Sequence, residues 1–163
     1  GTGSGCIACT IAKQTNAVVL GVDISSDALR IALDNVTKLG INNRAVFRKS
    51  NLYSAVRAEE KFDMIISNPP YIESSIIPTL QREVREYEPM LALDGGEDGL
   101  DFYRTIIEQA PKFLDKKGIL VLEIGYNQAE EISAMLEETD AFAKTEIVRD
   151  YGGNNRVVCA LLK

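Results

Sequence analysis

Short apolar runs alternate along the chain with stretches in which apolar residues recur every three or four positions. The runs at residues 17–23 (AVVLGVD), 45–51 and 118–125 are rich in β-branched and aliphatic residues, a pattern that predicts buried strands. A similar run at residues 62–71 predicts a further strand that ends at two consecutive prolines. The first of these strands is expected to be buried on both faces, because none of its positions before the final acid is polar.

Helices are predicted between the strands. One begins directly after the glycine-rich opening GTGSG, and the next starts at a Ser25 or Ser26 N-cap and ends at Gly40. Others are predicted over about 100–114 and 127–138, with a short polar helix over 79–87 inside the irregular segment 72–99. The helical positions expected to face the core are Leu29, Ala32, Leu33, Val36, Leu39, Ile132, Met135 and Leu136.

The last stretch, TEIVRD-YGGNN-RVVCALL, predicts two strands joined by a turn, and therefore an antiparallel hairpin. Strands that alternate with helices predict an α/β fold: a Rossmann-like, mostly parallel sheet covered on both faces and finished by this C-terminal hairpin. A strand normally precedes such a glycine loop, so the sequence as given is expected to begin after the first strand. We expect residues 1–163 to form one domain.

Composition restricts the chemistry. The 163 residues include no histidine, which excludes Ser-His and Cys-His catalytic pairs and most zinc sites. The net charge is −6, which disfavours direct nucleic-acid binding because that needs a surplus of Lys and Arg. Three cysteines form no disulfide framework, the opening is not a signal peptide, and no apolar run is long enough for a membrane span. We therefore expect a cytoplasmic protein with no membrane contact.

The opening loop places Gly1, Gly3 and Gly5 at alternate positions before a helix. Glycines let the backbone approach a ligand closely, and the helix N-terminus offers free N–H groups. Cys6 occupies the sixth position of the dinucleotide fingerprint, where a small residue is required. The pattern therefore favours a nucleoside lying against the loop over a bound pyrophosphate; the alternative is an ordinary glycine-rich turn.

Two further polar positions follow predicted strands. Asp23 ends the strand after the loop, where a carboxylate can accept both ribose hydroxyls; its alternative role is to cap the following helix. Asn51 ends the next strand, where its amide could meet an adenine edge while Leu52 packs on the ring. A simple strand-ending turn explains Asn51 equally well.

The segment Ser67-Asn68-Pro69-Pro70-Tyr71 is the most informative. Two prolines after a buried strand fix the backbone and remove two N–H donors, which leaves carbonyl groups facing outward. Asn68 adds a side-chain oxygen and Tyr71 an aromatic wall, at the carboxyl end of a strand where open α/β sheets place ligands.

Such an acceptor-rich notch suits alkylation of a planar nitrogen. An amide or aromatic NH2 can donate one hydrogen bond to the Asn68 side-chain oxygen and one to the Pro69 carbonyl. Both bonds strengthen as positive charge develops on the nitrogen, so no strong base is needed. The alternative is a purely structural Pro-Pro turn.

These residues, together with EP-x-x-AL (residues 88–93), LEIG (122–125) and RDYGGNNRV (149–157), resemble the HemK/PrmC protein-(glutamine-N5) methyltransferases. The resemblance spans nearly the whole chain. It implies a class I S-adenosylmethionine-dependent methyltransferase fold that methylates the glutamine amide of the Gly-Gly-Gln (GGQ) motif in peptide-chain release factors. The family's separate N-terminal helical substrate-binding domain is not represented in this sequence.

The resemblance also implies residue roles. Asn68 and the Pro69 carbonyl would hold the glutamine amide, while Pro70 and Tyr71 would shape the slot. Family members commonly carry Asp where this chain has Asn51. The implied contacts with S-adenosylmethionine fall on the loop, the two strand ends and the acceptor corner: Gly1, Thr2, Gly3, Ser4, Gly5, Asp23, Ile24, Asn51, Leu52 and Asn68.

Two other functions use the same features. A nucleic-acid methyltransferase acting on adenine N6 or guanine N2 would need the same NPPY corner, and the acidic charge disfavours it. A non-catalytic nucleotide-binding or NAD-linked module would need no such corner.

The remaining signals have structural interpretations. The Cys6-x-x-Cys9 pair is expected to be small core residues and not a metal site. The acidic GGEDG region is interpreted as a solvated turn that starts a helix, and Tyr87 with Glu88 as either a lid or a bend. An ion pair among Arg149, Asp150 and Arg156 is expected to stabilise the hairpin turn.

Overall fold

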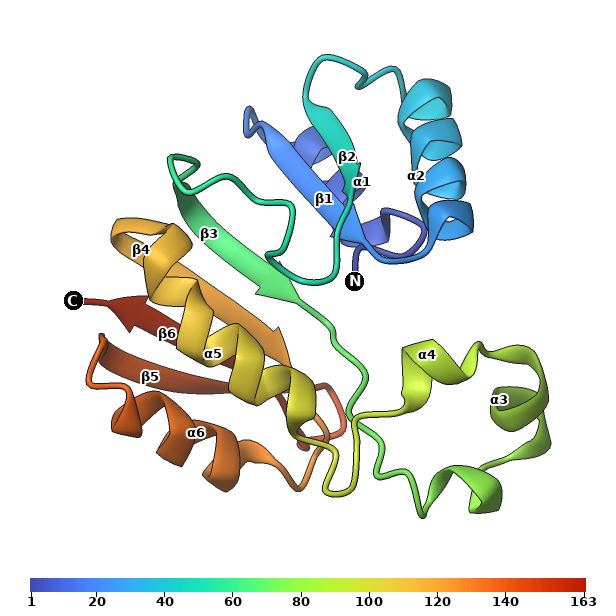
Figure 1. Cartoon of the computed structure of the whole chain (residues 1–163), viewed down its shortest axis with the longest axis vertical. Coiled ribbons are helices and arrows are strands. Elements are labelled where there is room, and N and C mark those ends of the chain that lie inside the picture. The colour runs from blue at the N-terminus through green and yellow to red at the C-terminus, as the bar shows by residue number, and fades with distance from the viewer. The chain divides into compact units, whose positions relative to one another are not determined.

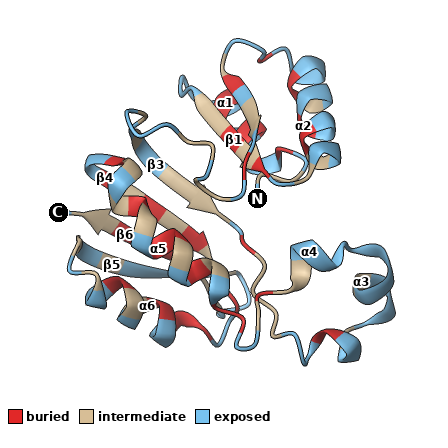
Figure 2. Cartoon of the chain, viewed as in Figure 1, coloured by how far each residue is buried: buried red, intermediate tan, exposed pale blue.

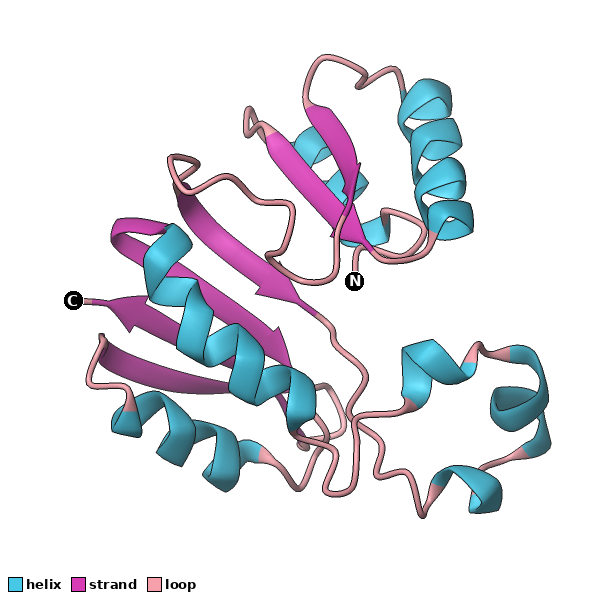
Figure 3. Cartoon of the chain, in the orientation of Figure 1, coloured by secondary structure: helices cyan, strands magenta, loops and turns pink.

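In the computed structural model, which describes residues 1–163, the chain forms two compact units. The first unit is Gly1–Arg57 and the second is Ala58–Lys163. Helices and strands alternate in both (Figures 1 and 3). The assignment of the whole chain to one domain stays a prediction.

The first unit is built on a pair of parallel strands. Its elements are α1 (Cys6–Gln14), β1 (Val19–Asp23), α2 (Ser26–Leu39) and β2 (Ala45–Lys49). Val19 pairs with Ala45 at one end of the ladder and Asp23 with Lys49 at the other. Parallel strands need a crossover, which α2 supplies, so the carboxyl ends of β1 and β2 lie at the same edge.

The ends of α2 follow the sequence prediction. Ser25 is the N-cap, and its Oγ accepts the Ala28 N–H at 3.2 Å. Gly40 ends the helix with φ 68°, a left-handed conformation that glycine adopts without steric cost. The prediction was wrong for Leu33 and Leu39, which are 51% and 40% exposed.

Close packing in the first unit depends on Gly21. A Cβ at this position would lie 2.4 Å from the Phe47 ring, so only glycine leaves room for the aromatic side chain against β1. Val18, just before the strand, is 74% exposed, so the predicted burial of the whole run 17–23 was wrong at its start. The core of this unit consists of Cys9, Ala12, Val36, Ile41 and Ala45, with Val19 and Phe47 packed against it.

The second unit contains a four-stranded mixed sheet. Its elements are β3 (Phe62–Ser67), a 3₁₀ turn η1 (Ile77–Thr79), α3 (Arg82–Tyr87), α4 (Met90–Leu93), α5 (Asp101–Phe113), β4 (Leu114–Glu123), α6 (Ala129–Glu138), β5 (Phe142–Arg149) and β6 (Asn155–Leu162). The strand order is β3-β4-β6-β5: β3 and β4 are parallel, and β6 runs antiparallel to both β4 and β5. The predicted C-terminal antiparallel hairpin is confirmed.

Helices α5 and α6 lie on one face of this sheet (Figure 1). The sequence predicted helices on both faces of the sheet, and within this unit only one face is covered by them. Figure 2 shows the buried residues gathered on β4 and on the inner sides of α5 and α6. Tyr103 of α5 is fully buried, and its hydroxyl donates to the Glu123 carbonyl at 2.8 Å.

The segment between β3 and α5 differs from the rest of the unit. Helices α3 and α4 project away from the sheet and contain no buried residue (Figure 2). Short helices without a buried face gain little from packing, so their placement depends on where the segment is attached.

Strands β1 and β3 are edge strands. β1 pairs only with β2 and β3 only with β4, so each leaves one row of backbone groups without a strand partner. The Thr2 N–H covers the end of the β1 edge by donating to the Val22 carbonyl at 2.8 Å. The expectation of a strand before the glycine loop stays a prediction.

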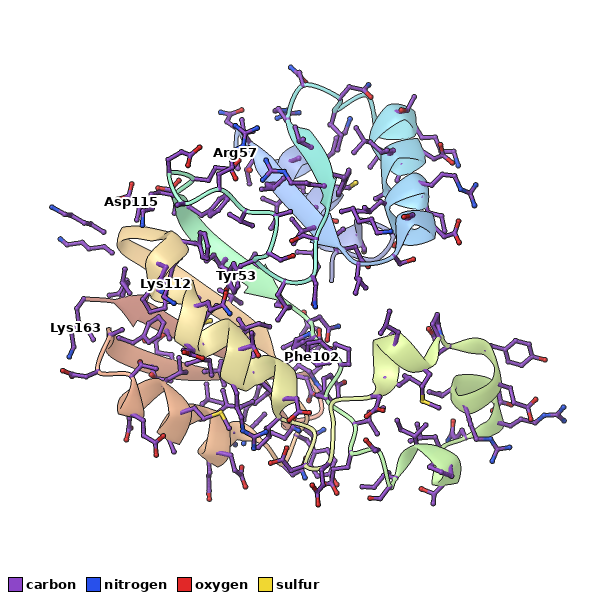
Figure 4. The ribbon with its side chains drawn as sticks, in the orientation of Figure 1. Tyr53, Arg57, Phe102, Lys112, Asp115 and Lys163 are labelled. Carbon is purple, nitrogen blue, oxygen red and sulfur yellow. The ribbon has the colours of Figure 1, made fainter.

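Figure 4 shows the side chains of the chain, with Lys112 and Lys163 among those labelled. Lys163 follows β6, where its side chain forms an ion pair with Asp140. Lys112 lies in the last turn of α5, and its carbonyl accepts a hydrogen bond from the Lys61 side chain.

None of the helices is both long and apolar enough to cross a membrane.

Candidate functional site

Asp23 is a buried charged residue of the first unit. It is 8% exposed and ends β1. Its Oδ2 accepts the Gly3 N–H at 2.8 Å, and its Oδ1 accepts the Ser25 N–H at 2.9 Å. Ser25, and not Asp23, is the N-cap of α2, so the capping alternative for Asp23 is wrong. Each carboxylate oxygen can accept a further hydrogen bond, and the two N–H donors fix its orientation.

The glycine loop takes the conformation that its sequence requires. Gly3 and Gly5 have φ 55° and 77°, values that other residues rarely adopt. A Cβ on Gly5 would lie 3.0 Å from the Ala32 Cβ and 3.1 Å from the Phe47 ring, so this glycine is buried in the packing. A Cβ on Gly3 would meet no atom within 4 Å. The loop is thus packed against Ala32 and Phe47 at Gly5, and it is open at Gly3.

Asn51 and Leu52 lie beside Asp23. The Ser50 N–H donates to the Asp23 carbonyl at 2.9 Å, which joins the ends of β1 and β2. The Ser50 hydroxyl donates to the Leu52 carbonyl at 2.7 Å, and Leu52 has φ 48°. The Asn51 side chain is exposed, and the Leu52 side chain is half-buried. The turn interpretation and the adenine-contact interpretation of Asn51 are both compatible with this geometry.

The first unit therefore brings most of its predicted cofactor residues to one edge of the parallel pair. Asp23 connects the glycine loop to the ends of both strands through hydrogen bonds. Ile24, also predicted, is 44% exposed directly after β1. Ser4 is exposed, and its carbonyl accepts from the Asn35 side chain at 2.9 Å.

In the second unit, the chain leaves β3 at Ser67 and enters the Pro-Pro corner, residues 68–71. The Asn68 side chain is exposed, and its carboxamide has no hydrogen-bond partner within the protein. Pro69 is buried, whereas Pro70 and Tyr71 are half-buried. An anchored backbone thus presents an unpartnered amide to solvent, which is the arrangement that binding a polar ligand needs.

Backbone pairing holds the chain directly after the corner. The Ile72 N–H donates to the Leu93 carbonyl at 3.0 Å, and the Gly95 N–H donates to the Ile72 carbonyl at 2.8 Å. Ser74 Oγ donates to Asp94 Oδ1 at 2.6 Å, which lowers the pKa of Asp94. Both ends of the segment that carries α3 and α4 are therefore fixed beside the corner.

Two glycines near the corner were not assigned a role from the sequence. A Cβ on Gly95 would lie 2.8 Å from the Tyr71 Cα, and a Cβ on Gly99 would lie 2.4 Å from the Tyr71 carbonyl oxygen. Only glycine permits this close approach of backbones. The GGEDG region was interpreted as a solvated turn that starts a helix. The helix start is confirmed, since α5 begins at Asp101, but the turn is not fully solvated, because Gly95 and Gly99 are buried. The spacing of its glycines was the signal that could have indicated the contact with Tyr71.

The RDYGGNNR segment closes against the end of β4. Arg156 donates to the Ile124 carbonyl at 3.2 Å and forms an ion pair with Asp150 at 3.2 Å. The Asn154 backbone N–H, with help from Arg156, holds the pKa of Asp150 below its usual value. The predicted ion pair at the hairpin turn is confirmed for Asp150 and Arg156.

The other sequence signals do not form a second site. Cys9 is buried in the core as predicted, but Cys6 is exposed, so the core interpretation was wrong for Cys6. Arg104 pairs with Asp98 and Asp101 in the acidic turn. No group of three or more Cys, Asp or Glu residues is placed to hold a metal ion. Tyr87 is the last residue of α3 and Glu88 is its C-cap, directly before Pro89 and α4. The lid and bend interpretations of these two residues both stay predictions.

Comparison with known proteins identifies the family of this chain. Residues 1–95 match the family described as the methyltransferase small domain. The chain belongs to this family. The resemblance found in the sequence is also confirmed, because the chain is 44% identical to the release factor glutamine methyltransferase of Geobacter sulfurreducens over 159 residues and 42% identical to that of Agrobacterium fabrum over 159 residues.

These alignments cover 97% of this chain and 55% and 54% of the two relatives. The chain thus spans about half the length of the curated relatives that it matches.

Solved structures show the fold of this methyltransferase small domain protein. A methyltransferase from Pyrococcus furiosus has a TM-score of 0.70 at 21% identity, with 100% of this chain and 72% of that chain covered. An O-methyltransferase from Bacillus cereus in complex with SAH has a TM-score of 0.65 at 13% identity, covering 100% and 71%. The predicted class I methyltransferase fold is confirmed.

Proposed function

We propose that the protein methylates the glutamine side-chain amide of the GGQ motif in a peptide-chain release factor, with S-adenosylmethionine as methyl donor. The observation that carries the proposal is the exposed, unpartnered carboxamide of Asn68 in a corner fixed by Pro69 and Pro70. The similarity to release factor glutamine methyltransferases supports the choice of acceptor. Release factors act in translation, so we place the protein in the cytoplasm.

The edge of the first unit fits S-adenosylmethionine. The open position over Gly3 leaves room for a ligand against the loop, which comprises Gly1, Thr2, Gly3, Ser4 and Gly5. Asp23 keeps acceptor capacity for ribose hydroxyls, and Ile24, Asn51 and Leu52 follow the two strand ends as candidate contacts with the rest of the nucleoside. When bound, S-adenosylmethionine supplies an electrophilic methyl group on a positively charged sulfur.

The corner of the second unit suits the acceptor amide. A glutamine NH2 would donate one hydrogen bond to the Asn68 side-chain oxygen and the other to the Pro69 carbonyl, with Pro70 and Tyr71 at the sides of the slot. These bonds favour a pyramidal nitrogen, whose lone pair is less delocalised into the carbonyl group and is available to the methyl carbon. The C–N bond then forms as the C–S bond breaks, and the nitrogen loses one proton after it becomes positively charged.

Nucleic-acid amino groups are the competing acceptors, because adenine N6 and guanine N2 also present a planar NH2. The net charge of −6 disfavours a phosphate-rich partner. The test is therefore a direct comparison of acceptors. The protein is incubated with S-adenosylmethionine and a release factor, its GGQ glutamine-to-alanine variant, DNA or RNA, and the products are analysed by mass spectrometry.

We expect one added methyl group on the release factor, located on the GGQ glutamine, and none on the alanine variant. Methylated adenine or guanine with an unmodified release factor would replace the proposed acceptor by nucleic acid. No transfer to any acceptor would refute the proposal for this chain.

A further inference from the structure

Gln128 is a buried polar residue directly before α6, and sequence analysis assigned it no role. It is 7% exposed and lies 57 residues after Tyr71. Its Nε2 donates to the Tyr71 carbonyl at 3.1 Å and to the Gly99 carbonyl at 3.2 Å. Its Oε1 accepts the Gly125 N–H at 3.0 Å. One side chain therefore joins the Pro-Pro corner, the glycine turn before α5 and the end of β4.

A primary carboxamide suits these three partners. It carries two N–H donors and one carbonyl oxygen, and here both donors meet carbonyl groups while the oxygen meets an N–H. A glutamate at position 128 would keep the acceptor but lose both donors. An apolar side chain of the same length would leave all three backbone groups without this partner.

Two glycines make room for this carboxamide, and a third brings the Tyr71 backbone close to the same segment. A Cβ on Gly99 would lie 2.9 Å from Nε2 of Gln128, and a Cβ on Gly125 would lie 2.8 Å from its Oε1. The approach of Gly95 to the Tyr71 backbone brings the same segments together. A turn that lies in solvent would not need glycine next to a buried side chain. The positions of Gly99 and Gly125 therefore show that the turn before α5 and the end of β4 are packed around Gln128.

The contact acts on the corner at its C-terminal end. β3 holds the corner at Ser67, and the proline rings restrict the backbone of Asn68, Pro69 and Pro70. After Tyr71 the peptide group is held on both sides: its carbonyl accepts from Gln128, and its N–H, that of Ile72, donates to the Leu93 carbonyl. With both ends held, the backbone that carries the Asn68 side chain and the Pro69 carbonyl keeps its conformation.

We propose that Gln128 is a positioning residue for the acceptor amide: it fixes the Tyr71 carbonyl and thereby sets the geometry in which Asn68 and Pro69 receive the NH2 group. This inference rests on the proposed function, because it assigns Gln128 to the acceptor corner. A displacement of about 1 Å at a reacting group can lower turnover about 100-fold, so loss of this contact should reduce kcat strongly.

The competing explanation is that Gln128 stabilises only the fold. Thr139, at the other end of α6, provides a matched control. Its hydroxyl donates to the Leu136 carbonyl at 2.8 Å and accepts the Ala141 N–H at 3.3 Å, so Thr139→Val also removes hydrogen bonds to backbone near this helix. Thr139→Val leaves the corner untouched.

The experiment compares wild type, Gln128→Met, Gln128→Asn and Thr139→Val in the full chain. Methyl transfer to a release factor gives kcat and KM, calorimetry gives the affinity for S-adenosylhomocysteine, and thermal unfolding gives stability. Gln128→Met should lower kcat about 10- to 100-fold, with cofactor affinity unchanged. Gln128→Asn retains the carboxamide one methylene short, so its kcat should fall between those of wild type and Gln128→Met, which provides a folded variant if the Met protein unfolds.

Thr139→Val should lose a similar amount of thermal stability and keep the wild-type kcat. The inference is overturned if both Gln128 variants keep kcat, or if they lose kcat and cofactor affinity together in proportion to stability. Wild-type protein that methylates no glutamine overturns the proposed function and this inference with it. If the wild type is active and the Gln128 variants behave like Thr139→Val, only the inference about Gln128 is overturned.

Discussion

The two candidate regions solve different problems with different kinds of contact. The edge of the first unit is held by hydrogen bonds that Asp23 makes with the glycine loop, with Ser25 and with Ser50 after the paired strand. The Pro-Pro corner is held by backbone rigidity and by Gln128, which reaches Tyr71 across 57 residues. The first region carries a charged group that a ligand can use, and the second offers only neutral acceptors.

This difference fits the two partners of a methyl transfer. A carboxylate with fixed orientation gives affinity for hydroxyl groups, and so acts on binding of the donor. Neutral oxygens next to an amide nitrogen contribute most when charge develops during the reaction, and so act on the rate. We therefore expect substitutions in the two regions to change different measured quantities.

The largest effect is expected at Asn68. Asn68→Ala removes the side-chain oxygen that would accept one N–H of the glutamine amide, so kcat should fall by about 100- to 1,000-fold. Affinity for S-adenosylhomocysteine, measured by calorimetry, should stay unchanged. Asn16→Ala changes an exposed asparagine in the first unit and serves as the control. Normal turnover by Asn68→Ala would remove Asn68 from the reaction.

The opposite pattern is expected at Asp23. Asp23→Ala should weaken cofactor binding by about 1–3 kcal/mol, the contribution of charge-assisted hydrogen bonds. Its control is Ser25→Ala, which removes the cap on α2 and should cost about 1 kcal/mol of stability with no loss of affinity. Calorimetry that finds equal affinities for Asp23→Ala and wild type would contradict the ribose assignment.

The same contrast explains what could be predicted from the sequence. A serine cap at position 25 or 26, the Gly40 helix end and a strand stop at the prolines depend on residues near one another in the chain, and all were predicted. Gln128 was not, because a lone glutamine after a strand looks the same whether it is solvated or buried. Its partners become apparent only when the chain is folded.

Errors in the predicted core have a similar cause. Helical periodicity identifies a face, but the width of that face depends on what packs against it. Ala32 and Val36 are buried, whereas Leu33 is exposed on the same helix. Cys9 is buried and Cys6, one turn earlier, is exposed.

A smaller effect is expected from glycine-to-alanine substitutions, whose cost in stability separates side-chain packing from backbone strain in the two regions. Gly153 and Gly40 have φ 84° and 68° with open space around a built Cβ, so Gly153→Ala and Gly40→Ala should cost only about 1–2 kcal/mol for the left-handed conformation. Gly99→Ala has similar strain plus a Cβ 2.4 Å from the Tyr71 carbonyl oxygen and should cost more. Gly5→Ala, with contacts of 3.0 Å and 3.1 Å to side chains, should fall between.

Urea unfolding of the four variants measures these costs. The expected order is Gly99→Ala as the largest loss, then Gly5→Ala, then the two controls. Equal losses at all four positions would mean that backbone strain alone decides them, and the close approach at Tyr71 would then contribute nothing measurable.

The smallest effect concerns the hairpin turn of the second unit, where the Asn154 backbone N–H and Arg156 lower the pKa of Asp150. The unfolded chain takes up this proton at higher pH than the folded protein does. The stabilisation is therefore present above the ordinary pKa of 3.8 and is lost as the pH falls through the lower, folded value. Asp150→Asn should flatten the decline of the urea midpoint in acid. Asn154→Ala keeps the backbone N–H and should retain most of that decline, so it serves as the control. Identical slopes for wild type and Asp150→Asn would show that Asp150 contributes nothing to the decline of the urea midpoint.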